Sequence, residues 1–196
     1  MNRLFTALAV AMLSFAALLP APAFAQAGNP DAVDLPPFFA ETFLNFPEDA
    51  ASAKKGGKRL LLYFGQDGCP YCKTLLETNF TQKTIVDKTK AKFVAIGLNI
   101  WGDRETVWFD GVTRKEKDLA KHLKVQFTPT ILLLDEKGAT IARINGYYPP
   151  HRFSAALDYS AQRLEGKTGF AEHMQAVPAT GARAAWVSAW GWRVPW

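Results

Sequence analysis

The sequence contains few residues that could bind a metal ion or cross-link the chain. Only two of its 196 residues are cysteines, Cys69 and Cys72. Its three histidines, His122, His151 and His173, are not paired at the spacing of metal ligands. A structural zinc ion needs about four ligands, so we expect no metal site. A disulfide between residues three apart closes too small a loop to hold a fold together, and a chain of this length can bury a core without one.

Long apolar runs are also scarce, and the one that is present lies at the N-terminus. Arg3 precedes an apolar run from Leu4 to Leu19, and an Ala-Phe-Ala sequence ends at Ala25 after a proline-rich stretch. This order is typical of a cleaved signal peptide, predicted here over residues 1–25. An uncleaved membrane anchor is the alternative, but the run is short for a span of about 20 residues. We therefore expect a periplasmic protein without a transmembrane span in the mature chain, in a compartment that preserves disulfides.

The chain has no block of charge of one sign. Its formal net charge is +5, and loss of Arg3 with the signal peptide leaves +4. Acidic residues are interleaved with the basic ones throughout, which is typical of a solvated surface. We therefore expect no nucleic-acid partner.

The remaining sequence predicts alternating strands and helices after a small-residue, proline-rich linker at residues 26–37. Continuous apolar runs predict buried strands at residues 60–64, 93–98 and 131–134. A short turn joins the last of these to a strand at residues 139–144, so that pair should be antiparallel. Helices are predicted at residues 47–55, 73–80, 82–90 and 152–164. The segment from residue 60 to residue 98 is thus a βαβ unit.

Both cysteines lie at the start of the first helix of this unit, in the motif Cys69-Pro70-Tyr71-Cys72. Free backbone N–H groups and the helix dipole favour an anion there, so we expect Cys69 to be an exposed, attacking thiolate. Cys72, one turn later, should be more buried and should resolve the mixed disulfide. Pro70 suits the first helical turn because its missing N–H costs nothing there. A redox-active pair is predicted; the alternatives are a static disulfide, half of a zinc site, or two unpaired core cysteines.

Two further patterns concern the segment after the second strand. A D-G turn signal within Val107–Val112 predicts a small hairpin. Thr113 and Glu116 have the spacing of a capping box, which predicts a helix that runs through about Leu123.

The C-terminal tail, residues 166–196, differs in composition from the rest of the chain. Four of the six tryptophans lie there, at Trp186, Trp190, Trp192 and Trp196. Such a tail could dock a partner or a membrane surface. The favoured alternative is a tail that folds back on its own domain or is disordered, because no charge pattern marks an interfacial helix.

Together these features resemble the thioredoxin superfamily over residues 38–164. The resemblance lies in the first strand, the Cys-Pro-Tyr-Cys motif at the head of a helix, and Thr128-Pro129 before a later strand. It implies an α/β thioredoxin-like fold, with a central mixed sheet flanked by helices, in a domain at residues 38–165. It also implies that Pro129 is cis beside the dithiol and that Thr128 offers its backbone to an incoming peptide. Both are predicted substrate-binding residues, and no cofactor is expected.

More narrowly, residues 99–111 and 125–130 resemble exported thioredoxin-like proteins of the sulfur-oxidation (Sox) type. This likeness implies disulfide-bearing exported proteins as substrates and a membrane thiol-transporting reductase as electron donor. The sequence differs from cytoplasmic thioredoxins in two ways that bear on the chemistry of the cysteines. Pro70-Tyr71 replaces the Gly-Pro pair of cytoplasmic thioredoxins, as in glutaredoxins. Tyr63 stands where those proteins carry a buried aspartate that helps deprotonate the resolving cysteine, so the proton acceptor of Cys72 is open.

The predicted function is therefore that of an exported thiol-disulfide oxidoreductase that reduces protein disulfides through Cys69 and Cys72. One alternative is a disulfide oxidase or isomerase, which would use the same two cysteines to form or rearrange disulfides. A non-catalytic binding module of the same fold is the alternative from a different class.

Overall fold

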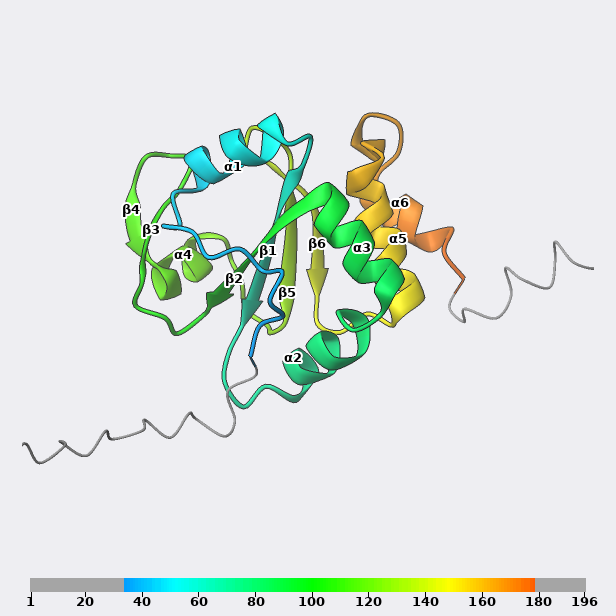
Figure 1. The fold of residues 1–196 in the computed structure, drawn as a ribbon, viewed down its shortest axis with the longest axis horizontal. Coiled ribbons are helices and arrows are strands. Elements are labelled where there is room, and N and C mark those ends of the chain that lie inside the picture. The colour runs from blue at the N-terminus through cyan, green and yellow to red at the C-terminus, as the bar shows by residue number, and fades with distance from the viewer. Residues whose placement is uncertain (1–33, 179–196) are drawn as a thin grey trace, which may run out of the picture. The chain divides into compact units, whose positions relative to one another are not determined.

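A computed structural model describes residues 34–178 of the chain (Figure 1). The predicted signal peptide and the four C-terminal tryptophans lie outside the described residues. Within residues 34–178, no helix has the length and apolar character needed to cross a bilayer.

The centre of the fold is a four-stranded mixed sheet in the order β2-β1-β5-β6. β1 (Arg59–Gly65) runs parallel to β2 (Phe93–Asn99) and antiparallel to β5 (Thr130–Leu134). β6 (Thr140–Asn145) pairs antiparallel with β5 at the edge. Every residue of β1 and β5 is buried, as expected for central strands that are covered on both faces. The predicted strands and the antiparallel return are confirmed.

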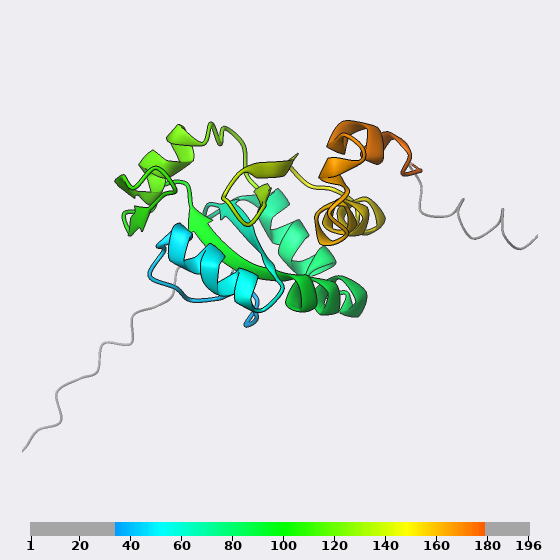
Figure 2. The same ribbon diagram turned by 90° about the horizontal axis from the view of Figure 1, so that it is seen from above.

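Helices cover both faces of this sheet (Figures 1 and 2). Side chains alternate between the two faces along a strand. Within residues 60–64, the even-numbered side chains share a core with α1 (Phe46–Lys55) and α4 (Glu116–His122). The odd-numbered ones share the opposite core with α3 (Lys83–Lys92), α5 (Pro150–Ala161) and both cysteines. The cysteines therefore lie on the α3–α5 side of the sheet.

The helix predicted at residues 73–80 begins earlier and changes type along its length. α2 (Pro70–Thr74) has Cys69 as its N-cap residue and is followed by the π-helix η1 (Leu75–Asn79). The N–H of Phe80 donates to the carbonyl of Leu75 at 3.3 Å, five residues back. Isolated π-helical turns of this kind often occur near functional sites.

The predicted hairpin is present between β2 and α4. β3 (Glu105–Val107) and β4 (Thr113–Lys115) pair antiparallel on either side of the D-G turn. Gly111 has φ 76°, in the left-handed region that glycine enters without strain.

The predicted capping box is wrong. Thr113 belongs to β4, and α4 begins at Glu116 with no side-chain cap from Lys115. The Glu116 side chain is only 2% exposed. Its carboxylate accepts hydrogen bonds from the backbone N–H of Asn99 at 3.1 Å and from the guanidinium of Arg104 at 2.6 Å. It therefore joins the end of β2 to the hairpin segment instead of closing a helix cap.

The last core helix, α5, ends at Ala161, three residues before its predicted end, because Arg163 leaves helical geometry with φ 56°. A short 3-10 helix, η2 (Leu164–Gly166), and α6 (Phe170–Gln175) follow. The Tyr159 hydroxyl of α5 donates to the carbonyl of Thr168 at 2.9 Å, and the ring centroids of Tyr159 and Phe170 lie 5.2 Å apart. The described beginning of the tail therefore packs against α5.

Candidate active site

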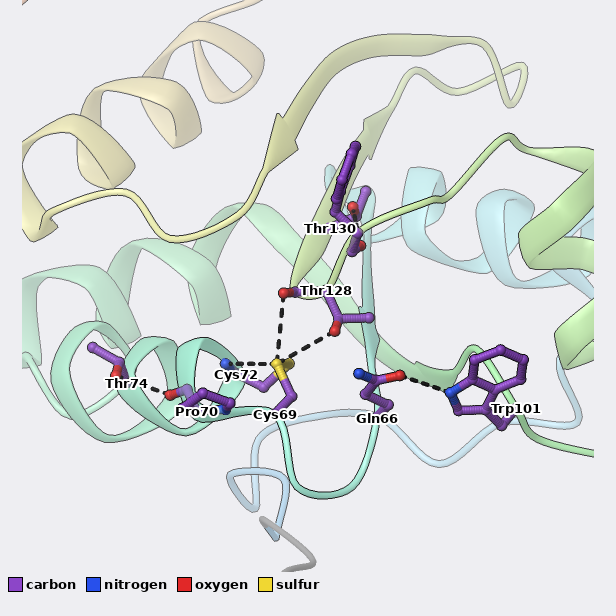
Figure 3. The surroundings of a disulfide bond; sticks show 9 residues. Gln66, Cys69, Pro70, Cys72, Thr74, Trp101, Thr128 and Thr130 are labelled. Atoms are coloured by element: carbon purple, nitrogen blue, oxygen red, sulfur yellow. Dashed lines mark hydrogen bonds between the residues drawn. A yellow bond between two sulfur atoms is a disulfide. The ribbon is translucent and has the colours of Figure 1, made fainter.

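The two cysteine sulfurs form a disulfide at the N-terminus of α2 (Figure 3). The Cα atoms of Cys69 and Cys72 are 5.2 Å apart, within the usual range for a disulfide. Gly68 turns the chain into the helix with φ 70°, and Pro70 occupies the first turn, where no N–H is needed. The N–H of Cys72 donates to the Cys69 sulfur at 3.1 Å. After reduction, this N–H and the helix start favour a thiolate at Cys69.

Cys69 is more exposed than Cys72, as predicted, but the difference is smaller than expected. Cys72 is 1% exposed and Cys69 is 6% exposed. Cys69 is therefore not an openly exposed sulfur. The side chains of Tyr71, which lies between the two cysteines in the sequence, and of Phe127, which precedes Thr128, are both exposed.

Thr128 lies against Cys69. The Thr128–Pro129 peptide bond is cis, and Pro129 immediately precedes β5. The Thr128 hydroxyl donates to the Cys69 sulfur at 3.3 Å, and the Thr128 carbonyl oxygen lies 3.5 Å from the same sulfur. The disulfide sulfur carries no proton, so the second distance is a contact in the oxidised protein. The hydroxyl and the carbonyl oxygen of Thr128 thus both lie next to the Cys69 sulfur.

Tyr63 lies in the same core as the cysteines and is 5% exposed. Burial raises the pKa of its phenol to about 12. The phenol therefore stays protonated near neutral pH and cannot accept a proton from Cys72. Tyr63 can act only as a hydrogen-bonding group at the position where the family carries an aspartate.

The structure contains a hydrogen bond between Gln66 and Trp101 that the sequence did not predict. The indole N–H of Trp101 donates to the Gln66 side-chain oxygen at 2.7 Å, and Gln66 lies between Cys69 and Trp101 in Figure 3. The two residues follow the ends of β1 and β2, which are parallel strands and so end at the same edge of the sheet. The parallel pairing of β1 and β2, together with the tryptophan two residues after Asn99, could have predicted this hydrogen bond.

Among the described residues, no group of three or more histidine, cysteine or acidic side chains is placed to hold a metal ion.

Comparison with known proteins identifies the family. A family profile described as a thioredoxin-like domain matches residues 46–161, which is more than half of the chain. The chain belongs to the thioredoxin superfamily. A thioredoxin-fold protein from Helicobacter pylori is 28% identical with a TM-score of 0.60, and the match covers 71% of this chain and 89% of that chain.

Two further solved structures are similar to part of this chain. A putative disulphide-isomerase from Bacteroides thetaiotaomicron is 21% identical with a TM-score of 0.50, over 63% of this chain and 93% of that chain. A thioredoxin from Thermus thermophilus is 22% identical with a TM-score of 0.47, over 69% of this chain and 95% of that chain. No protein of curated function shows a significant sequence match. The thioredoxin-like fold is confirmed, and the likeness to the sulfur-oxidation type stays a prediction.

Proposed function

We propose that this protein is an exported thiol-disulfide oxidoreductase that reduces protein disulfides by dithiol exchange. The observation that carries the proposal is the Cys69–Cys72 disulfide at the start of α2, with the Thr128 hydroxyl directed at the Cys69 sulfur. Membership of the thioredoxin superfamily supports the same chemistry. The exposed aromatic rings of Tyr71 and Phe127 beside the buried sulfur favour a polypeptide substrate, because such rings are typical of protein-binding surfaces.

We propose the following steps for the exchange. In the reduced protein, the Cys69 thiolate attacks one sulfur of a target disulfide. A bond forms between these two sulfurs, the target S–S bond breaks, and the departing target thiolate takes a proton from solvent. The Cys72 thiol then loses its proton to solvent, and the resulting thiolate attacks the Cys69 sulfur and releases the second target thiolate. Two electrons pass to the target, and the Cys69–Cys72 disulfide re-forms.

The proposal includes a location and two kinds of partner. The N-terminal segment supports export to the periplasm, where disulfide-bearing exported proteins would be the substrates. Each turnover leaves the protein oxidised, so it needs a dithiol donor. A membrane thiol-transporting reductase is the donor that we propose.

The test is a trapping experiment with Cys72→Ser. Without its resolving sulfur, this variant should accumulate mixed disulfides between Cys69 and its substrates in the periplasm. They should appear as reducible high-mass bands on a non-reducing gel, and Cys69→Ser should form none. If the Cys72→Ser variant captures no protein, exchange is not the function and a binding module takes its place.

The direction of electron flow is tested by the reduction potential of the Cys69–Cys72 pair. A reductase requires a value near that of thioredoxin or glutaredoxin, between about −270 and −200 mV. Equilibration with glutathione buffers measures it. A value near about −120 mV, typical of strong oxidants, would replace the reductase with an oxidase.

A further inference from the structure

A cavity of about 170 Å³ lies at the C-terminal ends of β1 and β2, on the side of Gln66 and the loop that leads to Cys69. It has room for several water molecules or for a side chain of comparable size. Tyr63, Gln66, Asn99 and Arg104 provide its polar groups, and Leu35 provides part of its apolar wall. The mechanism of disulfide exchange uses none of these side chains.

Two glycines make room for the side chains that form the walls of this cavity. Gly65 pairs with Asn99, and Gly97 pairs with Tyr63, in the register of the parallel strands. A side chain on Gly65 would collide with the Tyr63 ring, and one on Gly97 would collide with Leu35. Larger residues at these positions would therefore displace the walls that shape the cavity.

Trp101 orients two side-chain amides at the cavity. Its backbone N–H donates to the side-chain oxygen of Asn99 at 2.9 Å, and its indole N–H donates to the side-chain oxygen of Gln66 at 2.7 Å. An N–H group can only donate, so both amide oxygens must face Trp101 and both NH₂ groups must face elsewhere. In Figure 3 the Gln66 nitrogen lies on the side of Cys69. Neither NH₂ group donates to another residue among those the structure describes.

Tyr63 and Arg104 supply further donors at the cavity. Tyr63 is protonated near neutral pH, and its hydroxyl has no hydrogen-bond partner within the described part of the chain. The Arg104 guanidinium donates to the carbonyl of Gly97 at 2.9 Å and to Glu116 at 2.6 Å, so its positive charge is balanced. Asp67 adds a negative charge at the lining. Several donors without a net positive charge suit an uncharged acceptor better than an anion.

We propose that this cavity binds the side-chain amide of an asparagine or glutamine that adjoins the disulfide in a polypeptide substrate. Gln66, Asn99 and Tyr63 donate to the amide oxygen, and Trp101 is the positioning residue that turns the two protein amides toward it. The identity of the ligand as part of a substrate rests on the proposed function. Binding of the amide depends only on the cavity.

A titration with redox-inert peptides tests the proposal. The full-length, ¹⁵N-labelled, oxidised protein is titrated with acetyl-Ala-Ser-Gln-Gly-amide, in which serine replaces the substrate cysteine, and with versions that carry Glu, Lys or Leu in place of Gln. The side-chain NH₂ signals of Gln66 and Asn99 and the indole signal of Trp101 should shift with the Gln peptide. The Gln peptide should bind about tenfold more tightly than the other three, which is the effect of about 1.4 kcal/mol of hydrogen bonding.

Three variants complete the test. Trp101→Phe keeps an aromatic ring but loses the indole N–H. Gln66→Ala removes one donor and keeps the tryptophan at position 101. Each should reduce the preference for the Gln peptide about fivefold. Phe43→Ala removes an aromatic side chain that is 100% exposed and lines no part of the cavity, so it should bind as the wild type does. Equal affinity for the Gln and Leu peptides, or an unchanged preference in both cavity variants, overturns the proposal. Because these peptides contain no disulfide, the result is separate from the trapping experiment.

Discussion

At the scale of single residues, Thr128 has the most direct influence on the chemistry of Cys69. Its hydroxyl is the one side-chain donor that reaches the Cys69 sulfur in the described structure, at 3.3 Å. A hydrogen bond to a charged acceptor contributes about 1.5–3 kcal/mol, and about 1.4 kcal/mol corresponds to one pKa unit. Thr128→Val should therefore raise the pKa of the Cys69 thiol by about one unit. The pH dependence of Cys69 alkylation by iodoacetamide in the reduced protein measures this.

Thr128→Ser is the matched control, because it keeps the hydroxyl and removes only the methyl group. Its alkylation profile should stay near that of the wild type. If the valine variant also titrates like the wild type, the hydroxyl does not stabilise the thiolate, and the Cys72 N–H and the helix start are sufficient.

The residues of this site differ in how well the sequence predicts them. The cysteines and Thr128-Pro129 form contiguous motifs, so their roles were accessible from local pattern and family resemblance. The hydrogen bond between Gln66 and Trp101 joins residues 35 positions apart, and it depends on where two loops end in space. No local pattern contains that information, although the parallel pairing of the strands brings both loops to one edge.

At the scale of secondary-structure elements, Glu116 links β2, the hairpin segment and α4. The sequence pattern placed it in a helix cap with Thr113, but long-range donors compete for the same carboxylate. The backbone N–H groups of Asn99 and Arg104 and the guanidinium of Arg104 all donate to Glu116. Capping patterns describe local geometry alone, so they cannot detect partners that another strand brings near.

Replacement of Glu116 should therefore destabilise the fold. Glu116→Ala leaves the two backbone donors without their acceptor and the Arg104 guanidinium without its counter-charge, and we expect a loss of about 2–3 kcal/mol in the free energy of unfolding. Urea denaturation measures it. Asp103→Ala is the control, because it removes an exposed carboxylate whose ion pairs within residues 34–178 are those with Lys115 and Lys117, and it should leave the midpoint nearly unchanged. An equal effect of both substitutions would show that Glu116 is just another surface charge.

At the scale of the whole molecule, Arg59 connects parts of the chain that are far apart in sequence. It is 5% exposed and lies at the start of β1. Its guanidinium donates to Glu136 in the turn after β5 at 3.0 Å, to the carbonyl of Ser160 in α5 at 2.8 Å, and to Glu165 in η2 at 2.5 Å. The apolar runs predicted the sheet and helices of this region correctly, but a lone arginine beside a strand gave no indication that it would join them.

This cluster should make the stability of the fold depend on pH in the acid range. The hydrogen bond from Arg59 lowers the pKa of Glu136 to about 2, from an ordinary value of 4.5. Because the folded state holds Glu136 ionised, its contribution to stability is present above pH 4.5 and is lost as the pH falls from there toward 2. Arg59→Leu removes the main cause of the shift, leaves Glu136 with Arg163 as its remaining ion-pair partner, and removes the guanidinium that pairs with Glu165. It should lower the free energy of unfolding by about 3 kcal/mol at pH 7, and by clearly less at pH 3.

Urea denaturation at both pH values tests this, with Arg59→Lys as the variant that keeps the charge but not the planar donor group. Equal losses for Arg59→Leu at pH 7 and pH 3 would mean that Arg59 stabilises the fold through packing of its side chain and not through its ion pairs.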